Sequence, residues 1–416
     1  MSPLRPVVLL CVLGPLGCGA RSALDSYATD ASVAAISDAA VSTLTCAPAD
    51  AAAAPTCTTW QVAGPDQLLG PNPGNGSAVT MGAVIAVGCG VLVSWTTIAD
   101  VGESSAEATW TTRAAAFDGT PTGPAMAHPS LTVASVSGGT IELAANANGV
   151  GALVDDPIDC RFLPLDATGA DRGPVVTVTG SVCLGLTANG STSFSYVTAN
   201  GPEGATPSSL VTIDDQGAPI ATRALGDPPY RAIFARAVFG DGSFLLDTFE
   251  EDTLTAVYSG WLQHFSADGT ALSAPVISIP NAAPAQLAVT PSGALSSWWM
   301  GDSAAFAPVD PSGAIVGPVQ SEPFTEAPYG EALASTPSGD VLVTLLESSA
   351  SGESWTVFVQ EQAPDGTPRG PLTPLPNPPG EFDPSNITPI VAVDGAHALL
   401  VYENAGVHAL PLVCGD

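Results

Sequence analysis

The sequence predicts an all-β fold: a seven-bladed β-propeller of four-stranded blades, with the ring closed by strands from both ends of the chain. Two observations carry this prediction. The 416 residues include 43 glycines and 39 prolines, and only 12% are charged, which is typical of a folded chain with many turns. Beyond residue 57, these turns recur in two interleaved series with one shared period.

In the first series, a turn with Asp and Gly joins two short β-type runs, as in AAAFDGTPTGPAM and FAPVDPSGAIVGPVQ. A tight hairpin needs positive φ, which Gly adopts freely and Asp tolerates better than most residues. We interpret this series as the hairpins between the third and fourth strands of the blades. Its turn glycines, at intervals of 44 to 53 residues, are Gly119, Gly169, Gly217, Gly269, Gly313 and Gly366.

The second series lies between the first, in segments such as LAVTPSGALSSWW. Two hairpins per repeat mean four strands, and four strands of ~6 residues with their connections fill about 50 residues, the size of a propeller blade. We interpret these turns as the inner hairpins. Their glycines, on average about 51 residues apart, are Gly90, Gly149, Gly190, Gly242, Gly293, Gly339 and Gly395.

The ends of the chain decide the number of blades. Seven inner hairpins are present, but only six outer hairpins follow them. After Gly395 one more strand remains, GVHALPLVCGD, and the missing outer strand has a candidate in TTWQVAGPDQLLGP, at residues 58–71. Closure by both ends removes an exposed sheet edge. Seven blades are therefore favoured over six or eight, or over a string of β-sandwiches, which would not give one 50-residue period.

The first residues have the features of an export signal. Arg5 precedes an apolar run at residues 7–13, and the small residue Gly17 stands before Cys18. This region resembles a bacterial lipoprotein signal, in which the cysteine after the cleavage site carries the lipid. The resemblance implies a signal peptide at residues 1–17 and lipidation of Cys18. Ordinary secretion, with Cys18 in a disulfide, is the alternative.

The whole chain resembles bacterial lipoproteins that carry a β-propeller, and this likeness of architecture covers residues 57–416. It implies a location in the bacterial cell envelope, facing the periplasm or the cell surface. Residues 18–56 are rich in Ala, Ser, Thr and Asp and indicate a flexible tether, with a short helix over residues 33–41 as the alternative. We expect membrane attachment through lipid alone, because no later segment has the ~18 apolar residues of a membrane span.

Six cysteines remain after the signal and Cys18, and in an exported chain we expect them to form disulfides, with many connectivities open. Cys160 opens a third strand and Cys183 the first strand of the next blade, so this pair is preferred. Cys57 and Cys414, at the two ends of the propeller, could lock the ring. That choice leaves Cys46 with Cys89.

Charge excludes several classes of function. All nine basic residues are Arg, against 40 Asp and Glu, and the formal charge is -31. Without Lys there is no lysine Schiff base and no P-loop. The repulsive field argues against nucleic acid. The sequence holds no C-x2-C metal spacing and no G-x-S-x-G elbow. We expect a monomer that requires no cofactor.

The loops that join second and third strands of a propeller gather on one face, which we name the loop face. The hairpin turns gather on the other, the turn face. Every blade contributes an acid to its second-to-third loop, and the densest groups are Asp155, Asp156 and Asp159, and Glu250, Glu251 and Asp252. These acids could bind calcium or a cationic partner. The alternative is a solvated surface that keeps the protein soluble.

Aromatic residues offer a second kind of site. Trp298, Trp299 and Tyr230 are candidates for a ligand platform, and packing in the core is the alternative. The sequence thus predicts a lipid-anchored extracytoplasmic binding or scaffold module that holds an unidentified protein or carbohydrate at the acidic loop face. The alternative is a hydrolase or lyase that acts on polysaccharide with carboxylates of the same face. We favour binding over catalysis.

Overall fold

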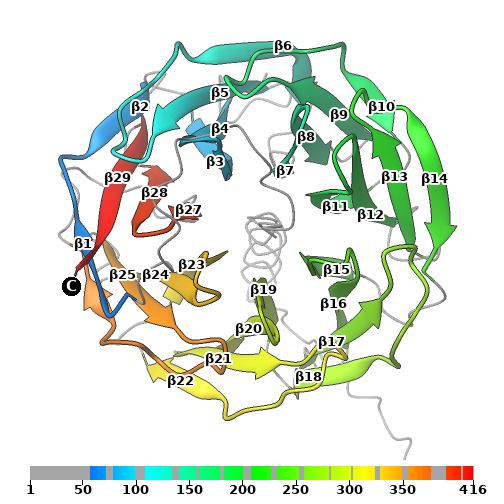
Figure 1. Cartoon of the computed structure of the whole chain (residues 1–416), viewed down its shortest axis with the longest axis vertical. Helices are drawn as coiled ribbons and strands as arrows, with labels where there is room; N and C mark the ends of the chain where they lie inside the picture. Colours follow the sequence, from blue (N-terminus) through cyan, green and yellow to red (C-terminus); the bar gives the residue numbers. More distant parts are fainter. Residues whose placement is uncertain are drawn as a thin grey trace, which may run out of the picture.

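The computed structural model describes most of the chain from residue 57 onwards. The described ranges are 57–71, 78–98, 108–133, 140–155, 159–178, 182–199, 208–225, 232–252, 257–280, 283–300, 303–323, 328–348, 355–375, 390–403 and 406–415. Seven antiparallel sheets stand in a ring around a central axis (Figure 1). The predicted seven-bladed β-propeller is therefore confirmed. The predicted signal, tether and lipidation site, Cys18, lie outside the described residues.

Blades 1 to 6 each follow the chain from the inner strand to the rim. Blade 1 holds β3 (Ala78–Val87), β4 (Gly90–Ile98), β5 (Ala108–Ala116) and β6 (Met126–Val133). Blade 2 holds β7 (Thr140–Asn146), β8 (Gly149–Asp155), β9 (Cys160–Leu165) and β10 (Val176–Val178). Blade 3 holds β11 (Val182–Ala188), β12 (Ser193–Ala199), β13 (Ser209–Asp214) and β14 (Pro219–Ala224).

The second half of the ring repeats this order. Blade 4 holds β15 (Ala232–Val238), β16 (Phe244–Asp252), β17 (Val257–Phe265) and β18 (Val276–Pro280). Blade 5 holds β19 (Ala283–Thr290), β20 (Gly293–Met300), β21 (Ser303–Val309) and β22 (Gln320–Pro323). Blade 6 holds β23 (Pro328–Ser335), β24 (Val341–Ser348), β25 (Trp355–Gln362) and β26 (Thr373–Pro374).

Blade 7 joins both ends of the described chain. It holds β27 (Ile390–Asp394), β28 (His397–Glu403), β29 (Gly406–Gly415) and two short N-terminal strands, β1 (Thr59–Val62) and β2 (Gln67–Pro71). Thr59 lies opposite Gly415, and Gln67 lies opposite Ala409. The predicted closing strand is therefore confirmed, and it is split where Pro65, which has no backbone donor, interrupts the pairing.

Burial falls from the second and third strands towards the rim. All but one of the residues of β28 are buried, because this strand packs against a sheet on each side, whereas every residue of β14 at the rim is exposed. This explains why the second strands read as continuous apolar runs instead of alternating ones. The core consists of the layers between neighbouring blades, and not of one central cluster.

Each outer turn packs a glycine against the preceding blade. At Gly217 in blade 3, φ is +85° and an added Cβ would stand 2.8 Å from the ring of Phe162 in blade 2. At Gly313 in blade 5, an added Cβ would stand 3.0 Å from Leu262 in blade 4. Glycine is needed here for its positive φ and for the close approach of the two blades. The same arrangement recurs at Gly119, Gly169, Gly269 and Gly366.

Aspartate closes the outer turns, as turn chemistry predicts. In one form, Asp310 accepts hydrogen bonds from the backbone N–H groups of Ser312 and Ala314 at 2.8 and 3.1 Å. In the other form, Asp365 accepts the N–H of Thr367 at 2.9 Å, which holds the pKa of Asp365 below its usual value. These acids therefore serve the turns, and no ligand is needed to explain them.

Blade 7 has no outer turn, and a disulfide stands at the place where the turn would be. Cys57 and Cys414 bond where β1 and the end of β29 meet, at a sequence separation of 357. Beside this bridge, Glu361 of blade 6 accepts hydrogen bonds from Trp60 Nε1 at 2.9 Å and from the Cys57 N–H at 3.3 Å. The bridge thus fastens β1 to β29 within blade 7, and the hydrogen bonds of Cys57 and Trp60 join this blade to blade 6.

The structure also contains the predicted disulfide between Cys160 and Cys183, which ties the third strand of blade 2 to the first strand of blade 3. Cys89 is a disulfide cysteine as well. Its predicted partner, Cys46, lies outside the described residues, so that pairing stays a prediction.

Replacing Cys57 and Cys414 by Ser should destabilise the ring more than replacing Cys160 and Cys183. In the chain-entropy model, a loop of 357 residues gives roughly 6 kcal/mol of stabilisation and a loop of 23 residues roughly 3 kcal/mol. Denaturant unfolding of the two double variants measures the difference. Equal losses would show that the bridge does not act as the ring's closure.

Candidate ligand-binding cavity

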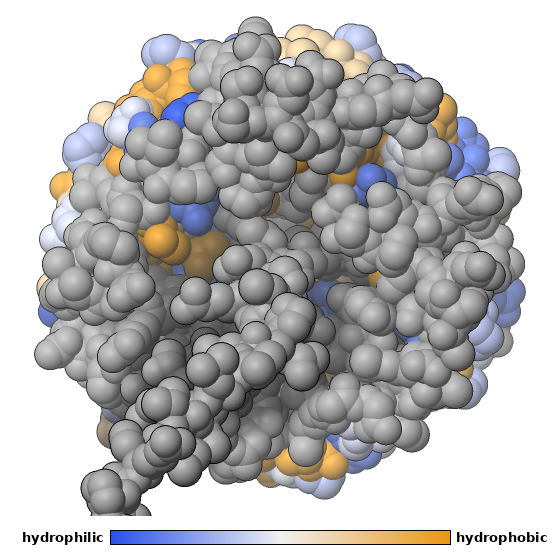
Figure 2. Space-filling model, turned by 180° about the vertical axis from the view of Figure 1, so that it is seen from behind, coloured by the Kyte–Doolittle hydropathy of each residue, from blue (hydrophilic) through white to orange (hydrophobic). Residues whose placement is uncertain are grey.

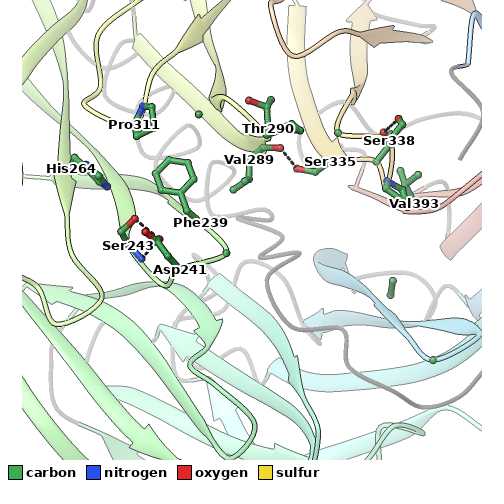
Figure 3. Close-up of a pocket in the computed structure, with 18 residues that line it drawn as sticks. Phe239, Asp241, Ser243, His264, Val289, Thr290, Pro311, Ser335, Ser338 and Val393 are labelled. Carbon is green, nitrogen blue, oxygen red and sulfur yellow. Dashed lines mark hydrogen bonds between the residues drawn. The ribbon is translucent and has the colours of Figure 1, made fainter. Parts of the chain in front are cut away.

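A cavity of about 720 Å³ opens among the inner turns on the turn face (Figure 3). Three turns supply most of its wall: the β15–β16 turn, the β19–β20 turn and the β23–β24 turn, in blades 4, 5 and 6. These turns are about 50 residues apart in sequence, and the ring places them side by side around the cavity. The remaining wall includes Ala86 and Gly88 of blade 1, Pro311 of blade 5 and Val393 of blade 7.

Hydroxyl groups and flat apolar surfaces alternate around the cavity. The lining residues that carry hydroxyl groups are Ser243, Thr290, Ser335, Thr336 and Ser338. Several of them are held in place: Ser335 Oγ donates to the Val289 carbonyl at 2.8 Å, and Thr336 Oγ1 lies 2.7 Å from Ser338 Oγ. The apolar part of the wall consists of Phe239, Val289, Pro291, Pro311 and Pro337.

Among the described residues that line the cavity, Asp241 is the one carboxylate. Its Oδ1 accepts hydrogen bonds from the hydroxyl and the backbone N–H of Ser243, at 2.6 and 2.9 Å. These bonds hold the pKa of Asp241 below its usual value, so the group is ionised at neutral pH. The described part of the wall contains no Arg. The cavity therefore favours neutral or cationic ligands over anions.

Two polar atoms of the wall are buried without a hydrogen-bond partner: His264 Nε2 and Thr290 Oγ1. The His264 ring meets Phe239 edge to face, with 5.8 Å between the ring centroids. Burial lowers the pKa of His264, which keeps the imidazole neutral at pH 7. A buried polar atom left unpaired costs about 1–3 kcal/mol. Both atoms are buried behind the wall, so they add no hydrogen-bonding surface to the cavity.

A belt of buried polar side chains lies between the blades. Glu142 of β7 accepts the backbone N–H groups of Gly185 and Leu186, and Arg236 of β15 donates to the Gly185 carbonyl at 3.1 Å. The bulged β11 of blade 3 is therefore held from blades 2 and 4. An added Cβ at Gly185 would stand 2.7 Å from the Arg236 side chain, so this contact needs glycine.

Two further acids of the belt are fully buried. Glu331 of β23 accepts a hydrogen bond from Ser297 Oγ, and Asp247 lies on β16 without an ion-pair partner among the described residues. Burial raises the pKa of Glu331 to about 8, of Glu142 to about 7, and of Asp247 well above its usual value. These acids were not predicted, because a single charge within an apolar strand looks like an outward-facing residue.

The first predicted acidic group of the loop face has structural partners where it is described. Asp155 ends β8 and accepts the Cys183 N–H at 3.1 Å, and Asp159 accepts from Arg161 Nε at 2.8 Å. Asp156 lies outside the described residues. In the described ranges no three His, Cys, Asp or Glu side chains are placed to hold a metal ion. Calcium binding at this face stays a prediction.

The second acidic group does not lie in a loop. β16 and β17 pair as far as Asp252 and Val257, with Glu250 opposite Ser259 and Glu251 opposite Tyr258. Glu250, Glu251 and Asp252 therefore belong to an extended hairpin of blade 4, where we had expected a loop. The period of the turns predicts where the hairpins lie, but it does not predict how many residues two strands pair over.

Trp298 is completely buried and packs with Ala305 and Ala307 of the neighbouring strand. It presents no surface to a ligand and serves packing. Trp299 lies on β20, but its side chain, like all of Tyr230, falls outside what the structure describes. Figure 2 views the molecule from behind Figure 1, and its described hydrophobic residues appear as separate patches, most of them towards the rim.

Comparisons with known proteins assign the chain to no family. No family model and no curated protein matches the chain. Among solved structures it is similar to the Dos1 propeller, with 8% identity and a TM-score of 0.47 over 86% of this chain and 95% of that one. It is also similar to the β-propeller domain of the trilobed protease from Pyrococcus furiosus, with 10% identity and a TM-score of 0.46 over 81% of this chain and 96% of that one.

A third similar structure is apo AztD from Citrobacter koseri, with 12% identity and a TM-score of 0.39 over 79% of this chain and 83% of that one. Identities this low say nothing about function.

Among the described residues no helix is long and apolar enough to cross a membrane.

The buried acids predict that stability falls as the pH rises from about 5 to 8. Their pKa values are higher in the folded than in the unfolded chain, so the folded state keeps protons that the unfolded state has lost. The stabilisation is complete below the unfolded pKa values and is lost as the pH rises through the folded ones. Thermal unfolding across this range measures the slope.

Glu331→Gln is the control for this pH dependence. An amide can still accept the Ser297 hydrogen bond but does not titrate, so part of the slope should disappear while the fold remains. An unchanged slope in this variant, or a wild-type protein that gains stability between pH 5 and 8, would contradict the assignment.

Proposed function

We propose that the protein is a lipid-anchored, extracytoplasmic binding module. Two disulfides indicate an oxidising location, since such bonds persist outside the cytosol. Lipidation at Cys18 and a place in the bacterial cell envelope rest on the sequence resemblance. A ring locked by disulfides offers a rigid frame, and rigid frames hold binding residues with little loss of entropy on association.

The turn-face cavity is the observation that carries the binding function. Fixed hydroxyls, one ionised carboxylate and an aromatic ring around about 720 Å³ suit a small neutral ligand rich in hydroxyl groups. The Phe239 ring can pack on the apolar face of a sugar, while Asp241 and the Ser and Thr hydroxyls exchange hydrogen bonds with its hydroxyls. We therefore propose a short neutral oligosaccharide as the ligand class.

A polysaccharide hydrolase or lyase is the second candidate. Glycoside hydrolysis usually requires two carboxyl groups about 5–10 Å apart, and the described wall of this cavity provides Asp241 alone. Binding without chemistry is therefore the function that the cavity supports best. A basic protein partner, or calcium, at Asp155, Asp156 and Asp159 remains a separate proposal for the loop face.

Replacing Asp241 by Asn should weaken binding of a neutral trisaccharide about tenfold, because a charged hydrogen-bond acceptor becomes a neutral one. Phe239→Ala should weaken it by a similar factor. Calorimetric titration of the mature protein with a panel of neutral trisaccharides measures both effects.

Asp365→Asn is the matched control. Asp365 accepts the N–H of the residue two positions later at 2.9 Å, as Asp241 does, but it lies in an outer turn away from the cavity. Its replacement should leave the affinity unchanged. Equal effects of the two substitutions, or no binding of any trisaccharide by the wild-type protein, would contradict the proposal.

A further inference from the structure

The inner turn of blade 3 carries an Asn-Gly pair, Asn189 and Gly190, in an open position. The four residues between β11 and β12, 189–192, are all exposed. At Gly190, φ is +75° and an added Cβ would have no heavy atom within 4 Å. Glycine favours a reaction of the preceding side-chain amide with the backbone, because it has no Cβ to block the approach to its nitrogen. The space around this pair is therefore free for a reaction within the turn.

The ends of this turn are fixed, but its reactive groups are not. The Asn189 N–H donates to the Ser193 carbonyl at 2.8 Å, and the Asn189 carbonyl accepts a hydrogen bond from Ser193 Oγ. Among the described residues, neither the Asn189 side-chain amide nor the Gly190 N–H has a hydrogen-bond partner. No such bond thus has to break before the Gly190 nitrogen approaches the side-chain carbon of Asn189.

Blade 2 carries the same pair in its inner turn, but there both groups are held. Asn148 Nδ2 donates to Asp215 Oδ2 at 3.0 Å, beside the ion pair of Asp215 with Arg172. The Gly149 N–H donates to Asn146 Oδ1 at 3.1 Å. Each of these hydrogen bonds has to break before the two groups can react, and each slows the reaction several-fold. The two Asn-Gly pairs are identical in sequence and differ in their contacts.

We propose that Asn189 is a site of spontaneous deamidation, in which the side-chain amide becomes a carboxylate without an enzyme. The Gly190 nitrogen loses its proton to water or hydroxide and bonds to Asn189 Cγ, the Cγ–Nδ2 bond breaks, and ammonia leaves. Water then opens the resulting succinimide ring at either carbonyl. One product is Asp, and the other is isoaspartate, in which the backbone runs through the former side chain. One water is consumed for each ammonia released.

The reaction changes the turn face beside the cavity. It adds a negative charge to blade 3, next to the blade whose inner turn carries Asp241. Isoaspartate also lengthens the backbone between β11 and β12 by a methylene group. The fold should tolerate this change, because Glu142 and Arg236 hold β11 from both neighbouring blades. Asn189 is not among the described residues that line the cavity, so the proposal is independent of the proposed function.

Peptide mass spectrometry of the mature wild-type protein, incubated for weeks at neutral pH, tests the proposal. The peptide with Asn189 should gain the mass of an amide-to-acid conversion, and an isoaspartate methyltransferase should label it. Asn148 should react at least about tenfold more slowly, because two hydrogen bonds hold its reactive groups. Equal rates at the two sites, or an unchanged Asn189, overturn the proposal.

Two controls separate the contacts from the sequence. In denaturant both sites should react at similar rates, and a difference that persists there overturns the assignment to the fold. Asn146→Ala removes the acceptor of the Gly149 N–H. In this variant Asn148 should deamidate several-fold faster while the rate at Asn189 stays the same. No gain at Asn148 would show that its hydrogen bonds do not protect it, which overturns the contrast on which the proposal rests.

Discussion

The fold depends on one repeated contact, the packing of each outer-turn glycine against the blade before it. Six turns make this contact in the same direction around the ring. One of the six is the turn of Gly119 in blade 1, which meets Gln67 and the Ala409 carbonyl of blade 7. The seventh position has a disulfide in place of the turn. Neighbouring blades are therefore joined at every position of the ring, by a turn glycine at six positions and by the contacts beside the disulfide at the seventh. Three of the inner turns form most of the wall of the cavity.

Several charged groups also join neighbouring blades. Arg172 of blade 2 pairs with Asp215 of blade 3 at 3.1 Å, and Arg223 of blade 3 pairs with Asp268 in the turn of blade 4. Every Arg in the described ranges has a hydrogen-bond partner within the fold, the remaining ones being Arg113, Arg161, Arg236 and Arg369. Arg suits such bridges because its guanidinium donates in a fixed plane. The negative charge of the surface consequently stays uncompensated, which is consistent with a cavity that favours neutral or cationic ligands.

The period of the turns predicted the blades, the closing strand and two disulfides, because tight turns need residue types that are visible in a sequence. The cavity could not be predicted. Its wall combines the turn of Asp241 with that of Ser338, and each turn by itself looks like any other hairpin. The buried belt was hidden for a different reason. Glu142 and Arg236 are single charges whose partners are backbone groups of another blade, and backbone groups leave no trace in the sequence. The length of the β16–β17 hairpin, which carries Glu250, could not be predicted either, because it depends on how far the two strands pair.

The central claim, that docking of the outer turns holds the ring together, can be tested within one blade. Gly190 and Gly217 both lie in turns of blade 3 with φ of +75° and +85°, but an added Cβ has open space at Gly190 and meets Phe162 of blade 2 at Gly217. Replacing either glycine by Ala adds backbone strain of about 1 kcal/mol. The replacement at Gly217 also forces blades 2 and 3 apart. The account predicts that Gly217→Ala lowers the unfolding free energy by at least about 1 kcal/mol more than Gly190→Ala. Equal losses in the two variants would contradict it.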